Sequence, residues 1–305
     1  MLEFVLLISK IFPLYVVVSL GYFAGKKFKA DRDTIATLLI YFIAPVVIFN
    51  GVASAPSSAK YLGLPAITLL VACILSVIFF TIAKRYFSGA ERNLIGFMSG
   101  TGNTGYFGLP VVLALFGVEM QNIAILATLG FVLFENTLGY YYIARHSLKA
   151  KDAALKLLKL PAIHAYALGV IVNLVGYHPS QVVADNIIYF RGAYVILGML
   201  IIGVGLSSVS RASVDKKLIT ISFAAKFIAF PAAVLVLKAI NDHTNTYDNS
   251  VMEVLLLLSV VPIASNTVAF ATKLKAHPEK AAFTVLASTI FALIYIPLII
   301  SIFIK

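Results

Sequence analysis

The chain has few charged residues and only one cysteine, and each scarcity excludes a class of protein. Charged residues make up 12% of its 305 residues and hydrophobic residues 61%, whereas a soluble domain carries about 25% charged residues. With a mean hydropathy of +0.97, the chain has more apolar surface than a water-soluble core could bury, so the lipid bilayer must be its solvent. Cys73 stands alone in an apolar segment, which excludes a disulfide or a thiolate metal site within one chain.

Motifs for metal binding, nucleotide hydrolysis and covalent catalysis are also missing from the sequence. The five histidines are isolated, no His-x3-His pair occurs, and no glycine-rich loop ends in Lys-Ser or Lys-Thr. No serine or cysteine nucleophile has a visible neighbouring base. We therefore expect no enzyme, no cofactor and no bound metal. The net charge of +11 does not indicate a nucleic-acid partner, because the basic residues lie in short loops beside apolar stretches.

Apolar segments long enough to cross about 30 Å of hydrocarbon recur along the chain and predict an all-α membrane protein. Ten transmembrane helices are expected, at residues 4–25, 34–52, 62–86, 92–117, 120–143, 161–176, 186–208, 217–239, 250–272 and 279–303. The loop at Lys149–Lys159 is the only one long enough to hold structure, and its alternation of lysine and leucine predicts a short amphipathic helix on the inner membrane surface.

The basic residues alternate between loops, and this alternation orients the expected helices. The even-numbered loops hold almost none. The odd-numbered loops hold Lys26, Lys27, Lys29 and Arg32; Lys84, Arg85 and Arg92; Arg145, Lys149, Lys151, Lys156 and Lys159; Arg211, Lys216 and Lys217; and Lys273, Lys275 and Lys280. By the positive-inside rule the odd-numbered loops are cytoplasmic, and both termini then lie outside.

Short motifs recur in the same order in the two halves of the chain. The first and sixth expected helices share Pro-x6-Leu-Gly, and the fourth and ninth share Asn-Thr: Pro13 with Leu20-Gly21, Pro161 with Leu168-Gly169, Asn103-Thr104 and Asn266-Thr267. Five helices per half, an odd number, give the halves opposite polarity in the membrane. The pattern therefore predicts two inverted five-helix repeats, residues 1–148 and 161–305, joined by a cytoplasmic connector at 149–160.

Both Asn-Thr pairs interrupt apolar segments where a helix should be running. The first lies among four glycines and is followed by Pro110, and the second follows Pro262. Glycine lowers helix stability and proline cannot donate a backbone hydrogen bond. A break in lipid is tolerated only where it lines a cavity or is buried in protein. A matched pair of breaks, one in each half, is the best pointer to a transporter's binding site.

We therefore predict broken helices 4 and 9, with helix-breaking residues Gly102, Pro110 and Pro262. The predicted substrate site consists of Asn103, Thr104, Gly105, Ser265, Asn266 and Thr267. A broken helix offers free N–H groups and the positive end of a dipole, which suit an anion such as a carboxylate. In the alternative interpretation, the glycines only allow close packing and the asparagines hydrogen-bond between helices.

Ionisable residues inside expected transmembrane helices are costly and usually functional. Glu135 lies inside the fifth helix and Lys226 near the middle of the eighth. Glu135 could carry a coupled proton, and Lys226 could pair with a carboxylate of the protein or of the substrate. A fixed ion pair, or snorkelling to an interface, is the alternative for both. Arg191 and Lys10 lie nearer the outer ends and are expected to be interfacial.

The whole chain resembles a prokaryotic member of the auxin efflux carrier family, which includes the plant PIN-type carriers. The residues that carry the resemblance are Gly102-Asn103-Thr104-Gly105-Tyr106-Phe107-Gly108-Leu109-Pro110 and Pro262-Ile263-Ala264-Ser265-Asn266-Thr267-Val268-Ala269-Phe270. The resemblance implies a fold related to bile acid/sodium symporters, with helices 4 and 9 crossing in an X. It implies a scaffold of helices 1, 2, 6 and 7 and a moving core of helices 3–5 and 8–10.

The resemblance further implies small organic anions as substrates, a homodimer, and an inner (plasma) membrane location. Two departures limit the transfer. Plant members have a proline at the first crossover, where this chain has Gly102, and a long central cytoplasmic loop, which is short here. Substrate identity and regulation by that loop therefore do not transfer.

The main hypothesis is a secondary active transporter of a small carboxylate, auxin-like or a dicarboxylate such as malate. It would work by elevator-type alternating access coupled to protons or to the membrane potential. Sodium coupling is the alternative, because the Asn, Thr and Glu side chains and exposed carbonyls offer hard oxygen ligands. An alternative of another class is a membrane channel or sensor without coupled transport.

Overall fold

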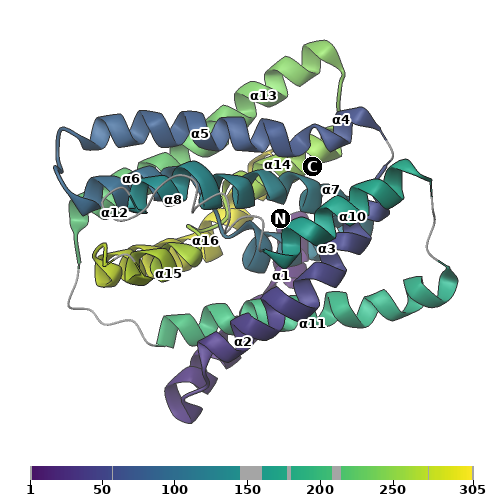
Figure 1. Ribbon diagram of the computed structural model, residues 1–305, viewed down its shortest axis with the longest axis horizontal. Coiled ribbons are helices and arrows are strands. Elements are labelled where there is room, and N and C mark those ends of the chain that lie inside the picture. The colour runs from purple at the N-terminus through teal and green to yellow at the C-terminus, as the bar shows by residue number, and fades with distance from the viewer. Residues whose placement is uncertain are drawn as a thin grey trace. The chain divides into compact units, whose positions relative to one another are not determined.

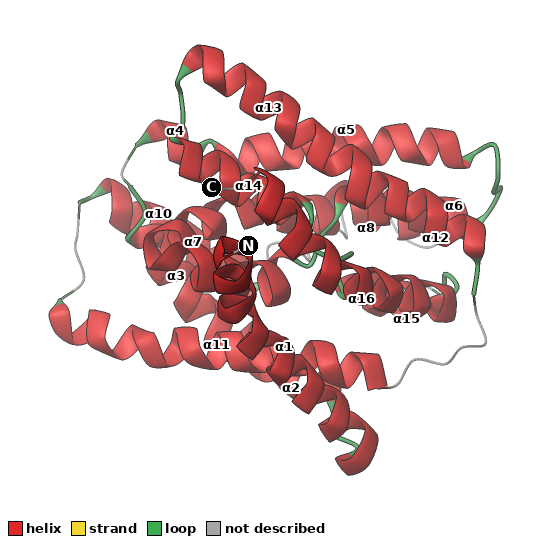
Figure 2. Ribbon diagram, turned by 180° about the vertical axis from the view of Figure 1, so that it is seen from behind, coloured by secondary structure: helices red, strands yellow, loops and turns green. Residues whose placement is uncertain are grey.

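The computed structural model describes residues 2–56, 58–144, 160–176, 180–207, 214–273 and 275–303. These residues form helices, turns and short connections, and they contain no strand (Figure 2). Each of the ten ranges expected to span the membrane contains helix. The amphipathic helix expected at Lys149–Lys159 lies outside the described residues.

Six of the described helical segments are long and apolar enough to cross a membrane: Arg32–Ala53, Lys60–Ala83, Ala90–Ile143, Asp185–Ser207, Lys216–Thr244 and Pro278–Phe303. Two shorter apolar helices are Pro161–Leu174 and Asn249–Ser259. Large apolar side chains point outward from several of them; Ile294 is 74% exposed and Ile228 69%. The protein is therefore an all-helical membrane protein. That ten helices cross the bilayer as two inverted repeats stays a prediction.

The chain divides into two compact units, each of which draws helices from both halves of the sequence. Unit 1 comprises residues 1–63, 105–126 and 158–208, and unit 2 comprises residues 64–104, 127–157 and 209–305. Residues 105–126, which were expected in the moving core, group with the helices of the expected scaffold. Whether the two units act as scaffold and core stays a prediction.

Unit 1 is built around two long helices and a shorter pair. Its helices are α1 (Leu2–Phe28), α2 (Arg32–Leu38), the π-helical η1 (Leu39–Ile43), α3 (Ala44–Ala53), α4 (Ala59–Leu62), α10 (Pro161–Leu174) and α11 (Gln181–Ser207), with the first part of α7 (Leu109–Phe134). α1 packs on α11, and α3 on α10 (Figure 1). The side chain of Asp31 caps α2 by accepting from the N–H groups of Asp33 and Thr34.

Glycines allow both helix pairs of unit 1 to approach closely. A Cβ on Gly21 of α1 would lie 2.3 Å from the carbonyl oxygen of Leu200, and one on Gly203 of α11 would lie 2.0 Å from that of Val18. A Cβ on Gly169 of α10 would lie 2.8 Å from the Cβ of Val52 in α3. Small residues at such contacts stabilise helix pairs in lipid by close packing.

Unit 2 carries both Asn-Thr pairs. Its helices are α5 (Leu64–Ala83), α6 (Ala90–Gly100), the end of α7, η3 (Glu135–Gly139), α8 (Tyr140–Ala144), α12 (Lys216–Phe223), η5 (Ala224–Ala229), α13 (Phe230–Thr244), α14 (Asn249–Ser259), α15 (Asn266–Lys273) and α16 (Pro278–Phe303). The π-helical η2 (Thr104–Gly108) joins α6 to α7. Buried Leu94, Phe97 and Met98 of α6 form its core with Ile263 and Val285.

A charged cluster lies at the starts of three helices in unit 2. The ammonium of Lys280 at the start of α16 donates to Glu91 of α6 at 2.9 Å and to Asp215 at 3.0 Å. Asp215 also caps α12 by accepting from the N–H of Leu218. Burial would raise the pKa of Asp215, but the Leu218 N–H and the Lys280 ammonium outweigh it and hold that pKa below its ordinary value. The three helices therefore begin at the same end of the unit.

Candidate functional site

The first helical interruption lies between α6 and η2. α6 ends at Gly100, and Thr101 has extended backbone angles, φ −111° and ψ 164°. Residues 101–103 are non-helical, and helix resumes at Thr104. Pro110 is the second residue of α7, which directly follows the π-helical η2, so its missing N–H takes one helical hydrogen bond away from this junction. Gly102 lies inside the interruption, whereas Pro110 lies after it.

The second interruption lies between α14 and α15, and a backbone hydrogen bond joins it to the first. α14 ends at Ser259 and α15 begins at Asn266, so Pro262 lies in the gap. The backbone N–H of Asn103 donates to the carbonyl of Pro262 at 2.7 Å. The two motifs, which come from opposite halves of the sequence, thus meet within unit 2. That they meet near mid-membrane stays a prediction.

Glu135 is buried beside both interruptions. Its side chain is 5% exposed and accepts hydrogen bonds from the Thr101 hydroxyl and, at 2.9 Å, from the Asn266 amide. Thr101 comes from the first interruption and Asn266 opens the helix after the second. We call Thr101, Glu135 and Asn266 the Glu135 cluster. Because it joins three segments, a change in the charge of this carboxyl group would act on all of them.

Lys226 is fully buried and has no hydrogen bond or ion pair among the described residues. Its Nζ lies 4.6 Å from the ring centroid of Phe230 and 5.8 Å from that of Phe131. These rings partly stabilise the ammonium through cation–π attraction. An ion pair between Lys226 and a carboxylate of the protein, one of the alternatives for this residue, does not occur at bonding distance in the described part of the chain. Lys226 is therefore a buried cation without a hydrogen-bonded counter-anion.

The glycine at position 102 leaves the space that the ammonium of Lys226 needs. A Cβ there would lie 2.6 Å from Nζ and 3.1 Å from a methyl carbon of Val261. Any side chain at this position, proline included, would require the ammonium to shift from its place. The departure from the plant pattern at Gly102 thus has a local reason in the presence of Lys226.

The other expected site residues have different surroundings. Asn103 and Thr104 are buried, at 5% and 2% exposure, and no hydrogen bond of their side chains is found in the described part of the chain. Thr267 is fully buried and its hydroxyl also has no partner among the described residues. Ser265 is half-buried. Gly105 belongs to unit 1, where a Cβ would lie 3.1 Å from the hydroxyl of Tyr194.

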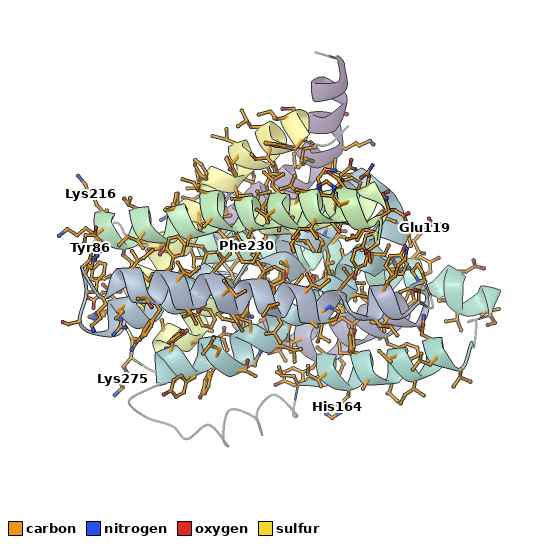
Figure 3. The ribbon with its side chains drawn as sticks, turned by 90° about the horizontal axis from the view of Figure 1, so that it is seen from above. Tyr86, Glu119, His164, Lys216, Phe230 and Lys275 are labelled. Atoms are coloured by element: carbon orange, nitrogen blue, oxygen red, sulfur yellow. The ribbon has the colours of Figure 1, made fainter. Side chains whose placement is uncertain are left out.

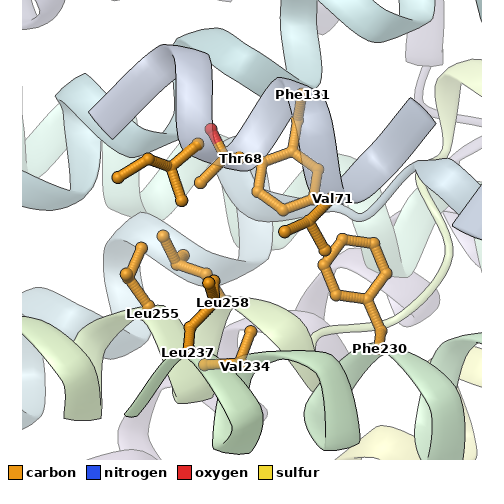
Figure 4. Close-up of a pocket in the computed structure, with 9 residues that line it drawn as sticks. Thr68, Val71, Phe131, Phe230, Val234, Leu237, Leu255 and Leu258 are labelled. Atoms are coloured by element: carbon orange, nitrogen blue, oxygen red, sulfur yellow. The ribbon is translucent and has the colours of Figure 1, made fainter. Parts of the chain in front are cut away.

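An apolar hollow in unit 2 uses the same two rings that lie over Lys226. Phe131 and Phe230 line it with residues of α5, α13 and α14 (Figure 4). Its one lining hydroxyl, that of Thr68, already donates to the carbonyl of Ala127 at 2.7 Å. The hollow therefore offers nothing to an anion.

Sequence reasoning missed one polar residue of note and did not foresee the partners of another. Thr101 was missed, although its place between two glycines, Gly100 and Gly102, is a signal for a hydroxyl in a helix break. The depth of Arg191 in the membrane stays a prediction, but its side chain is buried inside the protein, at 5% exposure. It donates to Gln121 at 2.7 Å, Asn50 at 3.0 Å and Asn122 at 2.7 Å, all in unit 1. Buried partners hold it inside the protein.

Comparison with known proteins agrees with this picture. The family model described as membrane transport protein matches residues 6–152 and 145–300. An uncharacterized transporter of Methanocaldococcus jannaschii is 28% identical over 296 residues, which cover 93% of this chain and 94% of that relative. The resemblance to the auxin efflux carriers is confirmed, and the chain belongs to the family of membrane transport proteins.

Proposed function

We propose that the protein is a secondary active transporter of a small organic anion. The observation that carries the proposal is the hydrogen bond between the two interruptions, from Asn103 N–H to the Pro262 carbonyl, beside a buried carboxylate and a buried, unbonded ammonium. Non-helical backbone within a transporter helix marks a place where solute or ion is bound. Charged groups buried in a membrane protein mark the solute or proton pathway.

Recognition of the anion would combine a charge with neutral donors. Lys226 supplies the positive charge, and the amides of Asn103 and Asn266 supply hydrogen-bond donors. The first turn of α15, which begins at Asn266, adds the positive end of a helix dipole. A carboxylate, auxin-like or of a dicarboxylate such as malate, fits this set of donors. Thr104, Ser265 and Thr267, which also belong to unit 2, complete the proposed site. The role of Gly105, which belongs to unit 1, stays a prediction from the sequence.

Coupling would act through Glu135. Protonation of this carboxyl would neutralise a buried charge and weaken its hydrogen bonds from Thr101 and Asn266. Because these donors belong to both interruptions, the change would reach both sides of the site. Sodium coupling is the second candidate, since the unbonded hydroxyl of Thr267 and the Glu135 carboxylate are hard oxygen ligands.

An elevator-type movement is proposed for the transport cycle. The division into two compact units supports it, because expected helices 1, 2, 6 and 7 fall in unit 1 and most of the others in unit 2. A homodimer formed by this scaffold is part of the proposal.

The proposed orientation places the odd-numbered loops in the cytoplasm of a prokaryotic cell, with both termini outside. One end of unit 2 gathers residues of three odd-numbered loops or their neighbours (Figure 3). They are Tyr86 at the third loop, Lys216 at the seventh and Lys275 at the ninth. The Lys280 cluster gathers the starts of α6, α12 and α16 at one end as well. Basic residues that share one end favour a single cytoplasmic face.

Uptake into proteoliposomes tests the proposed function. Purified protein would be offered radiolabelled mono- and dicarboxylates under imposed proton and sodium gradients. Proton coupling predicts that one carboxylate accumulates when the pH gradient is imposed. Glu135→Gln should remove that accumulation and retain exchange of labelled for unlabelled substrate. Glu119→Gln, at an exposed carboxylate, is the matched control.

Two results would contradict the proposal. Single-channel currents without accumulation of any carboxylate would show a channel. A Glu135→Gln protein that still concentrates substrate under a proton gradient would remove Glu135 as the proton carrier, and accumulation under a sodium gradient would then identify the second candidate.

A further inference from the structure

Arg191 brings a positive charge into unit 1 without a negative partner. Its guanidinium donates to the side-chain oxygens of Gln121, Asn50 and Asn122, all of which are neutral. The Nε–H is buried and has no acceptor among the described residues. No carboxylate of the described chain lies within ion-pair distance of it. We call Arg191, Asn50, Gln121 and Asn122 the Arg191 cluster.

This charge cannot be removed by loss of a proton, because arginine stays protonated in proteins. An unpaired ion in a protein interior carries a penalty of several kcal/mol, and amide dipoles offset only part of it. The cluster is also held in place: the Gln121 amide donates to the Leu109 carbonyl at 3.3 Å, which leaves its oxygen for Arg191. The arrangement is thus fixed and still short of one negative charge.

The cluster lies close beneath exposed chain. Asn50 is three residues before the end of α3 at Ala53. Gln121 and Asn122 follow Gly117, where the chain turns with φ +80° and where no atom would touch an added Cβ. Val118 next to it is 49% exposed, and Glu119 is exposed as well. The cluster therefore lies about one helical turn along α7 from exposed chain.

We propose that the Arg191 cluster binds a small monovalent anion, chloride or the carboxylate group of a small acid. The anion accepts from the Nε–H of Arg191. The amide nitrogens of Asn50 and Asn122 have no acceptor among the described residues and supply further donors. This site consists of residues other than those of the proposed transport site and does not depend on transport activity.

Thermal unfolding in detergent tests the site at constant ionic strength and constant cation. Chloride and formate would each replace gluconate, a much larger anion. Binding to the folded state raises Tm with ligand concentration, and we expect a rise of about 2–5 °C at saturation. Comparing the rise in Tm with chloride to the rise with formate shows whether the cluster binds a halide or a carboxylate.

Asn122→Asp supplies an internal carboxylate at an oxygen that already accepts from Arg191 at 2.7 Å. This variant should have a higher Tm in gluconate and should lose the response to chloride and formate. Glu119→Gln should keep the response. Lys226→Met should keep it too, which separates this site from the transport site.

If Arg191 only cross-links α3, α7 and α11 and binds no anion, a different outcome is expected. The Tm of the wild-type protein would then not depend on the anion, or would change equally in wild type and Asn122→Asp. Either result overturns the proposal. Because the measurement requires no transport, it can fail while the proposed function holds.

Discussion

Replacing Lys226 by methionine should make the protein more stable and remove its transport activity. The ammonium is fully buried, has no hydrogen bond among the described residues, and is stabilised by the rings of Phe230 and Phe131. Methionine has a similar length and no charge. A residue kept at a cost in stability is one that function requires.

The size of the effect follows from two opposing contributions. Replacing buried charged groups by apolar residues of similar volume stabilises proteins by about 1–4 kcal/mol. The lost cation–π attraction of a desolvated ammonium opposes this by up to about 2 kcal/mol. Glu135 keeps its donors Thr101 and Asn266 in the variant. We therefore expect a net gain of about 1–2 kcal/mol, a rise of a few degrees in Tm.

The assay pairs thermal unfolding in detergent with uptake in proteoliposomes. Lys238→Met is the matched control, since Lys238 is on the neighbouring α13 and makes an exposed ion pair with Asp242 at 3.6 Å, which contributes little. This control should leave both measurements unchanged. A Lys226→Met protein that unfolds several degrees earlier, or that transports at the wild-type rate, would refute the reasoning and make Lys226 a structural residue.

Further predictions concern the interruptions, the charged cluster and the topology. Asn266→Ala and Asn103→Ala should each weaken substrate affinity by about 10- to 150-fold, because each removes a hydrogen bond to a charged group. Asn136→Ala is the control and should not change the affinity, because the Asn136 amide donates to the Val132 carbonyl one turn earlier. Wild-type affinity in the first two variants would show that these asparagines only pack. Gly102→Ala should lower uptake by displacing the Lys226 ammonium, and wild-type uptake would contradict the contact. The pKa of Asp215 is lowered in the folded state. The stabilisation that Asp215 contributes is therefore present above its unfolded pKa of about 4 and is lost as the pH falls through its folded pKa. Asp215→Asn should lower Tm at pH 7, and the Tm of this variant should fall less steeply in acid than that of the wild type. In a Cys73→Ala background, an impermeant thiol reagent added outside should label a cysteine at position 58 and not one at position 153, and the reverse pattern would invert the topology.

Helix positions could be predicted from the sequence because a helix that crosses the bilayer needs a minimum length of apolar residues. Apolar length marks a helix, and the expected ranges coincide closely with described helices, as for α16 at Pro278–Phe303 against 279–303. The interruptions could be located because glycine and proline act locally on the backbone. The shift from α-helical to π-helical geometry at Glu135 and Lys226 has no such local signal and could not be foreseen.

Side-chain partners could be predicted only where charge or motif singled them out. Glu135 and Lys226 were identified by their cost in lipid, but the preference of Glu135 for Thr101 and Asn266 over Lys226 depends on the packing of distant segments. Arg191 was assigned to an interface because it lies near the outer end of its expected helix. Its three amide partners, which lie 69 to 141 residues away in sequence, could not be foreseen. Hydrogen bonds at that separation leave no pattern in a single sequence.

The glycine contacts of unit 1 constrain the order in which the protein can fold. α1 is made first, yet the surface on which Gly21 packs belongs to α11, which ends at Ser207. α3 likewise needs α10, whose Asn173 amide donates to the carbonyls of Val52, Ala53 and Ala55 at its end. The early helices must therefore remain in the membrane unassembled while roughly half of the chain is still being synthesised. During that interval their glycine-lined faces are open to lipid or to an insertion chaperone, and the assembly of unit 1 is a late, post-insertion step.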